Sequence, residues 1–326
     1  MKSSKLPLSC RARVRLSVAA LSAAGTLVLC ALLVGCSLSP LAKHATAFSL
    51  ATNTVVSSSE DAYRAANRLR QDEQIAESIY AYEKNPNTWN PYTDWKPLLS
   101  PSQLDARIKV LDGLRAYAAS LVQLTGKPSK TDSDALDSAA SGVGSNLQGL
   151  SQTVSTDLST AIPGVSAIST TNTNIISTAV LGLGEYLQGR KVRGSLPKVT
   201  QDMNQNVQTL CELLKQDIDV LRRQADVDYG SLIESESQFL LHQGGTLTPV
   251  EKRNETGKLI VMASEEKAND ALLEKLQDAI VKLALTHQAL AAAAQGNNPE
   301  TLQQKISDLE AAGEELGNFY KSLPTT

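Results

Sequence analysis

The sequence predicts an all-α protein, an elongated antiparallel bundle of about six helices, and three observations support this fold class. Aromatic residues make up only 4% of the 326 residues, whereas compact globular proteins usually bury more aromatic side chains. No stretch shows the alternating Val, Ile, Thr and Tyr pattern of a β-sheet. Apolar residues instead recur at steps of three and four over long stretches. We therefore expect a single helical-bundle domain over residues 44–326.

The first 35 residues are expected to be a signal peptide that is removed. Five Lys and Arg residues precede an uncharged run over 16–35, and this is the layout of a secretory signal. The run is also long enough for a retained transmembrane anchor, which is the alternative interpretation. Residues 36–43 are then expected to form a short tether in front of the first helix.

The end of this run, Leu33-Val34-Gly35-Cys36, resembles the lipobox of bacterial lipoproteins. The resemblance covers only the leader, and it implies cleavage before Cys36 and acylation of that cysteine with fatty acids such as palmitate. Ser37 follows the cysteine where Asp would signal retention in the inner membrane of Gram-negative bacteria. The resemblance therefore implies an outer-membrane lipoprotein that faces the periplasm.

The charge of the mature chain restricts its partners. The leader contains five of the 31 Lys and Arg residues and none of the 34 Asp and Glu residues, so 26 basic residues remain against 34 acidic ones, a net charge near −8. An acidic surface argues against binding to nucleic acid or strong adsorption to anionic lipid. Cys211 is the one cysteine left unmodified in the mature chain, and we expect it to be buried in a helix.

A first helix is expected over 44–82, with a weak point at 53–59 where a new helix could begin. An aromatic and proline-rich loop follows over 85–99, because its prolines forbid a continuous helix. The favoured interpretation is an aromatic plug at one end of the bundle, and the alternative is a recognition loop. In the second case the candidate binding residues are Trp89, Tyr92 and Trp95.

Two further helices are expected over about 100–126 and 131–158, and they lead into an uncharged stretch. The uncharged run covers 158–184, and the candidate segment 158–187 contains too many polar residues for a conventional membrane span. It is interpreted as a packing seam of small residues, and the alternative is a tip that inserts into membranes under some conditions. The candidate inserting residues are Ile168, Ile175, Ile176, Val180 and Leu183.

The predicted centre of the bundle is a long helical hairpin over 195–294. Gly244 and Gly245 are expected to end its first helix in the left-handed conformation, and Thr248 and Glu251 are expected to form a capping box at the start of the second. Because the connection is so short, the two helices should lie antiparallel. A last helix is expected to begin at Pro299 and to dock on the bundle.

The sequence contains no recognisable catalytic arrangement. The three histidines are scattered, and His287 is expected to be a partly buried helix residue rather than a metal ligand. Glycine pairs lack the third glycine of a dinucleotide loop. We therefore expect a non-enzyme with no cofactor, no metal and no evident small-molecule substrate. The expected function is a scaffold, adaptor or binding module in the cell envelope, bound to another envelope protein or to itself; the alternative is a membrane-active, pore-forming-like protein that inserts 158–187.

Overall fold

The computed structural model describes residues 40–87, 89–90, 96–125, 179, 182 and 196–322. The chain divides into Met1–Ser39 and a second unit, Pro40–Thr326, and every described residue belongs to the second unit. All regular secondary structure in this described part is helical, which confirms the predicted all-α class. The predicted third helix, 131–158, lies outside the described residues.

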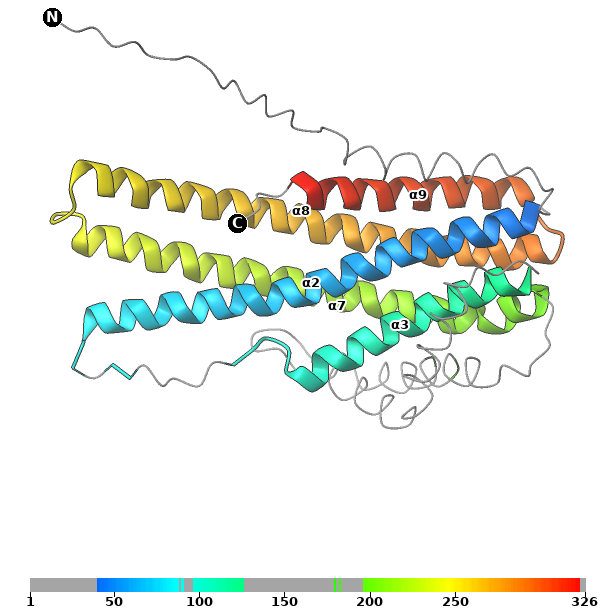
Figure 1. Cartoon of the computed structure of the whole chain (residues 1–326), viewed down its shortest axis with the longest axis horizontal. Helices are drawn as coiled ribbons and strands as arrows, with labels where there is room; N and C mark the ends of the chain where they lie inside the picture. Colours follow the sequence, from blue (N-terminus) through cyan, green and yellow to red (C-terminus); the bar gives the residue numbers. More distant parts are fainter. Residues whose placement is uncertain are drawn as a thin grey trace, which may run out of the picture. The chain divides into compact units, whose positions relative to one another are not determined.

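Five helices are described, three of which are about twice as long as the other two (Figure 1). The long ones are α2 (Pro40–Lys84), α7 (Leu196–Gln243) and α8 (Pro249–Ala294). The short ones are α3 (Pro101–Leu124) and α9 (Pro299–Ser322). No helix within these described residues is both long and apolar enough to cross a membrane.

Helix α2 differs from its prediction in two respects. It begins at Pro40, inside the expected tether, because proline is compatible with the first position of a helix. It also continues through the expected weak point at 53–59. The Thr52 hydroxyl donates to the Phe48 carbonyl at 2.7 Å, and the Ser59 hydroxyl donates to the Val55 carbonyl at 2.9 Å. Since these buried hydroxyls bond to the preceding turn, the polar residues fit inside the helix.

The connection between α7 and α8 combines one confirmed prediction with one correction. Thr248 and Glu251 form the predicted capping box, with each side chain bonded to the other residue's backbone N–H. Gly244 and Gly245 do not take the expected left-handed conformation, since Gly296 is the one glycine with a positive φ in the described part. Gly244 is needed for space instead, because an added Cβ would lie 2.2 Å from the Leu240 carbonyl oxygen.

Contacts between α7 and α8 run along both helices. Gln208 Nε2 donates to the Ala284 carbonyl at 2.7 Å, and Gln277 Nε2 donates to the Lys215 carbonyl at 3.2 Å. Arg222 of α7 forms an ion pair with Asp270 of α8. In these three contacts the residue numbers rise along α7 as they fall along α8, so the two helices lie antiparallel.

The apolar core lies in one half of the long helices, where α3 and α9 cover them (Figure 1). Helix α3 packs on α2 and α7, and α9 packs on α8 and α2. The buried apolar positions stop at Ala66 in α2 and Ala225 in α7, and they begin at Leu272 in α8. The largest fully buried side chains are Phe48, Tyr63, Leu99, Leu111, Tyr117, Leu121, Leu210, Ile218 and Leu221.

The remaining parts of α2, α7 and α8 extend past this core, and we call them the distal arm. The arm consists of residues 67–84, 226–243 and 249–271, all of which the structure describes. Its apolar side chains are half-buried or exposed, and none is fully buried. Glu73 and Asp228 are the two side chains that the arm buries completely. The three helix ends therefore pack around a polar centre instead of an apolar one.

Candidate functional site

The predicted aromatic loop meets the C-terminal end of α2 through Trp89. The Trp89 indole N–H donates to the Ser78 hydroxyl at 3.0 Å. The indole ring also stands edge-on to Tyr82, with 5.1 Å between ring centres. Trp89 keeps 36% of its surface exposed, so its ring lies on the outside of α2. Tyr92 and Trp95 lie outside the described residues.

Two side-chain amides of α2 hold the end of the same loop against the helix, and the residue pattern does not predict these contacts. Gln74 donates to the Lys96 carbonyl at 2.7 Å and accepts from the Lys96 N–H at 2.9 Å. Asn67 makes the same two bonds with Leu99, at 3.0 and 2.7 Å. Each amide therefore pairs with one backbone residue as a neighbouring strand would, and the segment 96–99 is fixed along two turns of α2.

An apolar stripe on α2 lies beside this loop. It consists of Ile75, Ile79 and Tyr82, which are 40%, 54% and 48% exposed, together with Trp89. Steps of four and three place the three helical residues on one face. At about 100° per residue, that face is opposite the buried side chain of Glu73. The stripe thus points away from α7 and α8, and we call it the α2 stripe.

The centre of the distal arm is a group of carboxylates around one arginine. Arg70 contacts Glu73 at 3.3 Å and Asp228 at 3.0 Å, and Gln224 donates to Asp228 at 2.8 Å. Burial, followed by the charge of nearby Glu77, raises the pKa of Glu73 to about 7. Burial likewise raises the pKa of Asp228, although its bond from Gln224 and the charge of Arg70 oppose the shift. Glu73 therefore gains its proton near neutral pH, and Asp228 gains its proton at a higher pH than an ordinary aspartate does.

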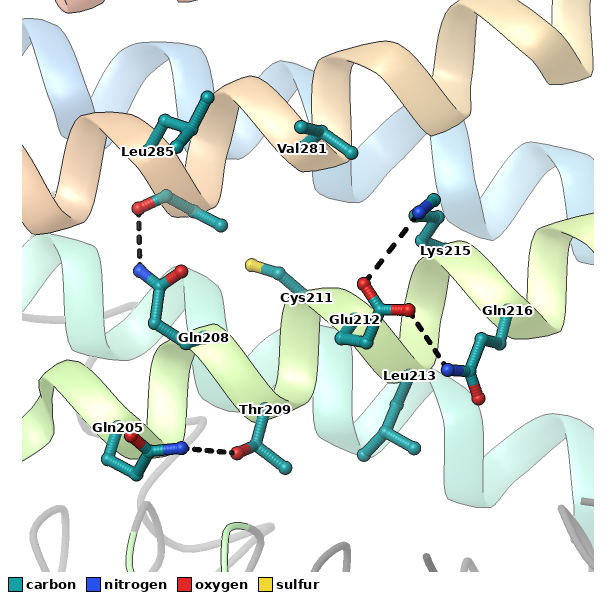
Figure 2. Close-up of a pocket in the computed structure, with 11 residues that line it drawn as sticks. Gln205, Gln208, Thr209, Cys211, Glu212, Leu213, Lys215, Gln216, Val281 and Leu285 are labelled. Atoms are coloured by element: carbon teal, nitrogen blue, oxygen red, sulfur yellow. Dashed lines mark hydrogen bonds and ion pairs between the residues drawn. The ribbon is translucent and has the colours of Figure 1, made fainter. Parts of the chain in front are cut away.

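A groove of about 450 Å³ lies between α7 and α8, near the middle of the core (Figure 2). Its polar side chains pair mainly within α7, where Glu212 contacts both Gln216, at 2.9 Å, and Lys215, at 3.8 Å. Gln208 crosses the groove to the Ala284 carbonyl. Cys211 also lines the groove, but it is buried as predicted, and burial raises the pKa of its thiol to about 12. The thiol stays protonated at physiological pH, so it is a poor nucleophile.

His287 lies at the centre of a buried polar chain that joins three helices. Its Nε2 atom is 2.7 Å from the Tyr117 hydroxyl on α3, and its Nδ1 atom is 3.1 Å from Asn204 Oδ1 on α7. The Asn204 oxygen can only accept, so Nδ1 carries the proton and Nε2 accepts from Tyr117. The ring is fully buried rather than partly buried as predicted, and burial lowers its pKa to about 3. His287 thus bridges α3, α7 and α8 as a neutral side chain.

A buried ion pair forms a second bridge between α3 and α7. Arg107 donates to the two carboxylate oxygens of Asp217 at 2.7 and 2.9 Å, and to the Gln103 carbonyl at 3.2 Å. Its guanidinium carbon lies 5.8 Å from the centre of the Tyr63 ring. Because these donors and acceptors satisfy one another, the pair stabilises the packing of the helices.

The remaining predicted site residues are not in the described part. Cys36 precedes it, and the candidate inserting residues Ile168, Ile175, Ile176, Val180 and Leu183 fall in the gap before α7. Within the residues that are described, no cluster of three or more His, Cys, Asp or Glu side chains has the arrangement of a metal site. The features that stand out are therefore the α2 stripe with Trp89 and the polar centre of the distal arm.

No known protein family, no curated protein and no solved structure matches this chain.

Proposed function

We propose that the protein is an outer-membrane lipoprotein, anchored through Cys36, that acts as a non-catalytic scaffold or adaptor for another protein in the periplasm. In this proposal the mature chain is an elongated antiparallel bundle of about six helices, organised around the hairpin 195–294. The lipobox-like sequence supports the anchor, and the distal arm supports the scaffold.

The distal arm is the observation that carries the proposal. Helices that extend beyond the apolar core bury little further apolar surface, so the extension contributes little to the stability of the bundle alone. Here α2, α7 and α8 continue for several turns beyond the core and keep apolar side chains exposed, including Ile75 and Ile79, one turn apart on α2, at 40% and 54%. Exposed apolar side chains in neighbouring positions are typical of surfaces that another molecule covers.

The position of the arm fits a protein that presents a surface away from its anchor. Helix α2 begins at Pro40, four residues after Cys36. At 1.5 Å per residue, Tyr82 lies roughly 63 Å along the helix axis from Pro40. A lipid at Cys36 would therefore hold one end of α2 near the membrane, while the α2 stripe lies at the other end of the same rigid helix.

Membrane fractionation of a Gram-negative host tests the anchor. We expect the tagged full chain to sediment with the outer membrane. In the Cys36→Ser variant, residue 36 can no longer be acylated as a cysteine. Mass spectrometry of the N-terminal peptide should show the acyl chains on Cys36. Recovery in the inner membrane, or an unmodified Cys36, would contradict the proposal.

Dye release from liposomes tests the scaffold against a membrane-active protein. The chain from Ser37 contains the whole described core, and we expect it to release no dye at any pH between 5 and 8. Release that Ile175→Asp abolishes would instead favour insertion of 158–187.

A further inference from the structure

We propose that the α2 stripe, Ile75, Ile79, Tyr82 and Trp89, binds an amphipathic helix of a partner protein that carries Lys or Arg beside its apolar face. This inference rests on the proposed scaffold function and names the chemistry of the partner.

The size and residue types of the stripe match a helix as its occupant. Ile75 and Tyr82 are seven residues apart, so the stripe covers about two turns, or roughly 10 Å of helix. An amphipathic helix presents apolar side chains over the same length at steps of three and four. Trp and Tyr contribute strongly to binding because they bury a large area with few rotatable bonds. The two aromatic rings here lie next to one another at the end of the stripe.

The stripe is also held in shape before any partner binds. Ser78 lies between Ile75 and Tyr82 on the same side of α2, and it fixes the Trp89 indole through its hydrogen bond. Gln74 fixes the end of the loop at Lys96. Binding to a surface that is already ordered avoids most of the entropy cost of arranging side chains.

The charge of the arm indicates a basic partner. Asp72 and Glu83 lie on the face of α2 that also carries Ile79, at steps of seven and four, so they flank one edge of the stripe. Arg68 is the basic residue on the same face, seven residues before Ile75. Without the buried Glu73 and Asp228, the whole arm contains 11 Asp and Glu residues against seven Lys and Arg residues. A second copy of the chain, or an anionic membrane, would bring like charges together at this surface. These acidic residues are Asp72, Glu77, Glu83, Asp226, Glu234, Glu236, Glu251, Glu255, Glu265, Glu266 and Asp270, and the basic residues are Arg68, Arg70, Lys84, Lys252, Arg253, Lys258 and Lys267.

A titration with two designed peptides tests the proposal. Both are 18-residue amphipathic helices with leucine on the apolar face and no tryptophan, and the polar face carries lysine in one and glutamate in the other. They are added to the chain from Ser37, whose apolar core lies entirely after Pro40. Tryptophan emission reports binding, because both tryptophans lie in the loop 85–99. We expect the lysine peptide to shift this emission to shorter wavelength and to bind at least about tenfold more tightly than the glutamate peptide.

Two variants on the same helix separate the stripe from general attraction to an acidic protein. Ile79→Ser should weaken binding of the lysine peptide about tenfold. Leu50→Ser is the matched control, because Leu50 is also exposed on α2, at 64%, but lies beside the covered core. It should bind as the unaltered chain does. Both side chains are exposed, so the circular dichroism spectrum and thermal midpoint should remain unchanged.

Several results would overturn the proposal. Equal binding by Ile79→Ser and Leu50→Ser would place the peptide elsewhere, and equal binding of the two peptides would remove the role of charge. An emission shift with phosphatidylcholine vesicles that Ile79→Ser abolishes, without a response to peptide, would assign the stripe to a lipid surface. Self-association that Ile79→Ser abolishes would assign it to a second copy. The chain from Ser37 has no anchor, so these results are independent of the fractionation test.

Discussion

Single residues show how the polar interior of this bundle fixes the arrangement of its helices. His287, Tyr117 and Asn204 come from three helices, and each supplies the hydrogen-bond partner that another needs. The same holds for Arg107 and Asp217. A buried polar group without a partner would cost about 1–3 kcal/mol. These bridges therefore favour one arrangement of α3 against α7 and α8 over a helix that slides or rotates.

Protonation of His287 should destabilise the fold. Its pKa is lowered to about 3 in the folded chain, whereas a histidine in the unfolded chain titrates near 6.5. Between these values the unfolded state binds the proton and the folded state does not, so stability falls as the pH drops below about 6.5. The His287 contribution should fall by about 3 kcal/mol between pH 6.5 and pH 4.

Urea denaturation of the unaltered chain and of His287→Gln at several pH values measures this contribution. Glutamine can still accept from Tyr117 and donate to Asn204, but it does not titrate. The difference in unfolding free energy between the two chains should change with pH in the direction given above. A difference that is constant from pH 7 to pH 4 would show that the ring takes up a proton without cost.

At the scale of helices, the residue spacing predicted where helices form better than it predicted their continuity and the contacts of their polar side chains. The capping box at Thr248 was legible because it is a local, four-residue pattern. The continuity of α2 through 53–59 was not, because Ser and Thr hydroxyls can bond back to their own helix, as they do here, or to the backbone of a turn. Gln74 and Asn67 were missed for a related reason, because nothing in a sequence relates them to backbone atoms 22 and 32 residues away.

The distal arm should be more stable in mild acid than at neutral pH, opposite to the effect of His287. The pKa of Glu73 is raised to about 7 in the folded chain, above the unfolded value near 4.3. The folded arm therefore binds more protons between these values, and its stability decreases as the pH rises from about 4.5 through 7. Asp228 acts in the same direction, since its pKa is also raised.

Hydrogen exchange of the arm amides, measured at pH 5.5 and pH 8 and corrected for the intrinsic rate, tests this. Protection should be lower at pH 8, and Glu73→Gln should restore it, because glutamine resembles the protonated acid. Glu77→Gln is the nearest comparison, and it should restore part of the protection by removing a charge that acts on Glu73. Arm protection that rises with pH in the unaltered chain would contradict the assigned direction.

At the scale of the whole molecule, the long helices have an apolar core in one half, and the distal arm has no apolar core. The low aromatic content and the recurrence of apolar residues every three or four positions predicted the class of the fold, because every long helix shows this spacing. They did not predict where full burial ends, because α7 keeps its apolar spacing through Leu232 and Phe239 although those positions are only half-buried. Burial is set by which other helices reach a position, and that depends on contacts far apart in the sequence.

The core and the arm should therefore respond separately to substitution. Leu276 is fully buried in the core, so Leu276→Ala should lower the free energy of global unfolding by about 2–5 kcal/mol. Phe239 is half-buried in the arm, and Phe239→Ala should increase hydrogen exchange in the arm while leaving exchange of the core amides unchanged. Local opening of this kind follows from few buried apolar contacts, since regions of a protein unfold with free energies that depend on their own packing. If Phe239→Ala instead accelerated exchange in core and arm equally, the molecule would unfold as one unit, and the arm would not be the separately adjustable surface that a scaffold requires.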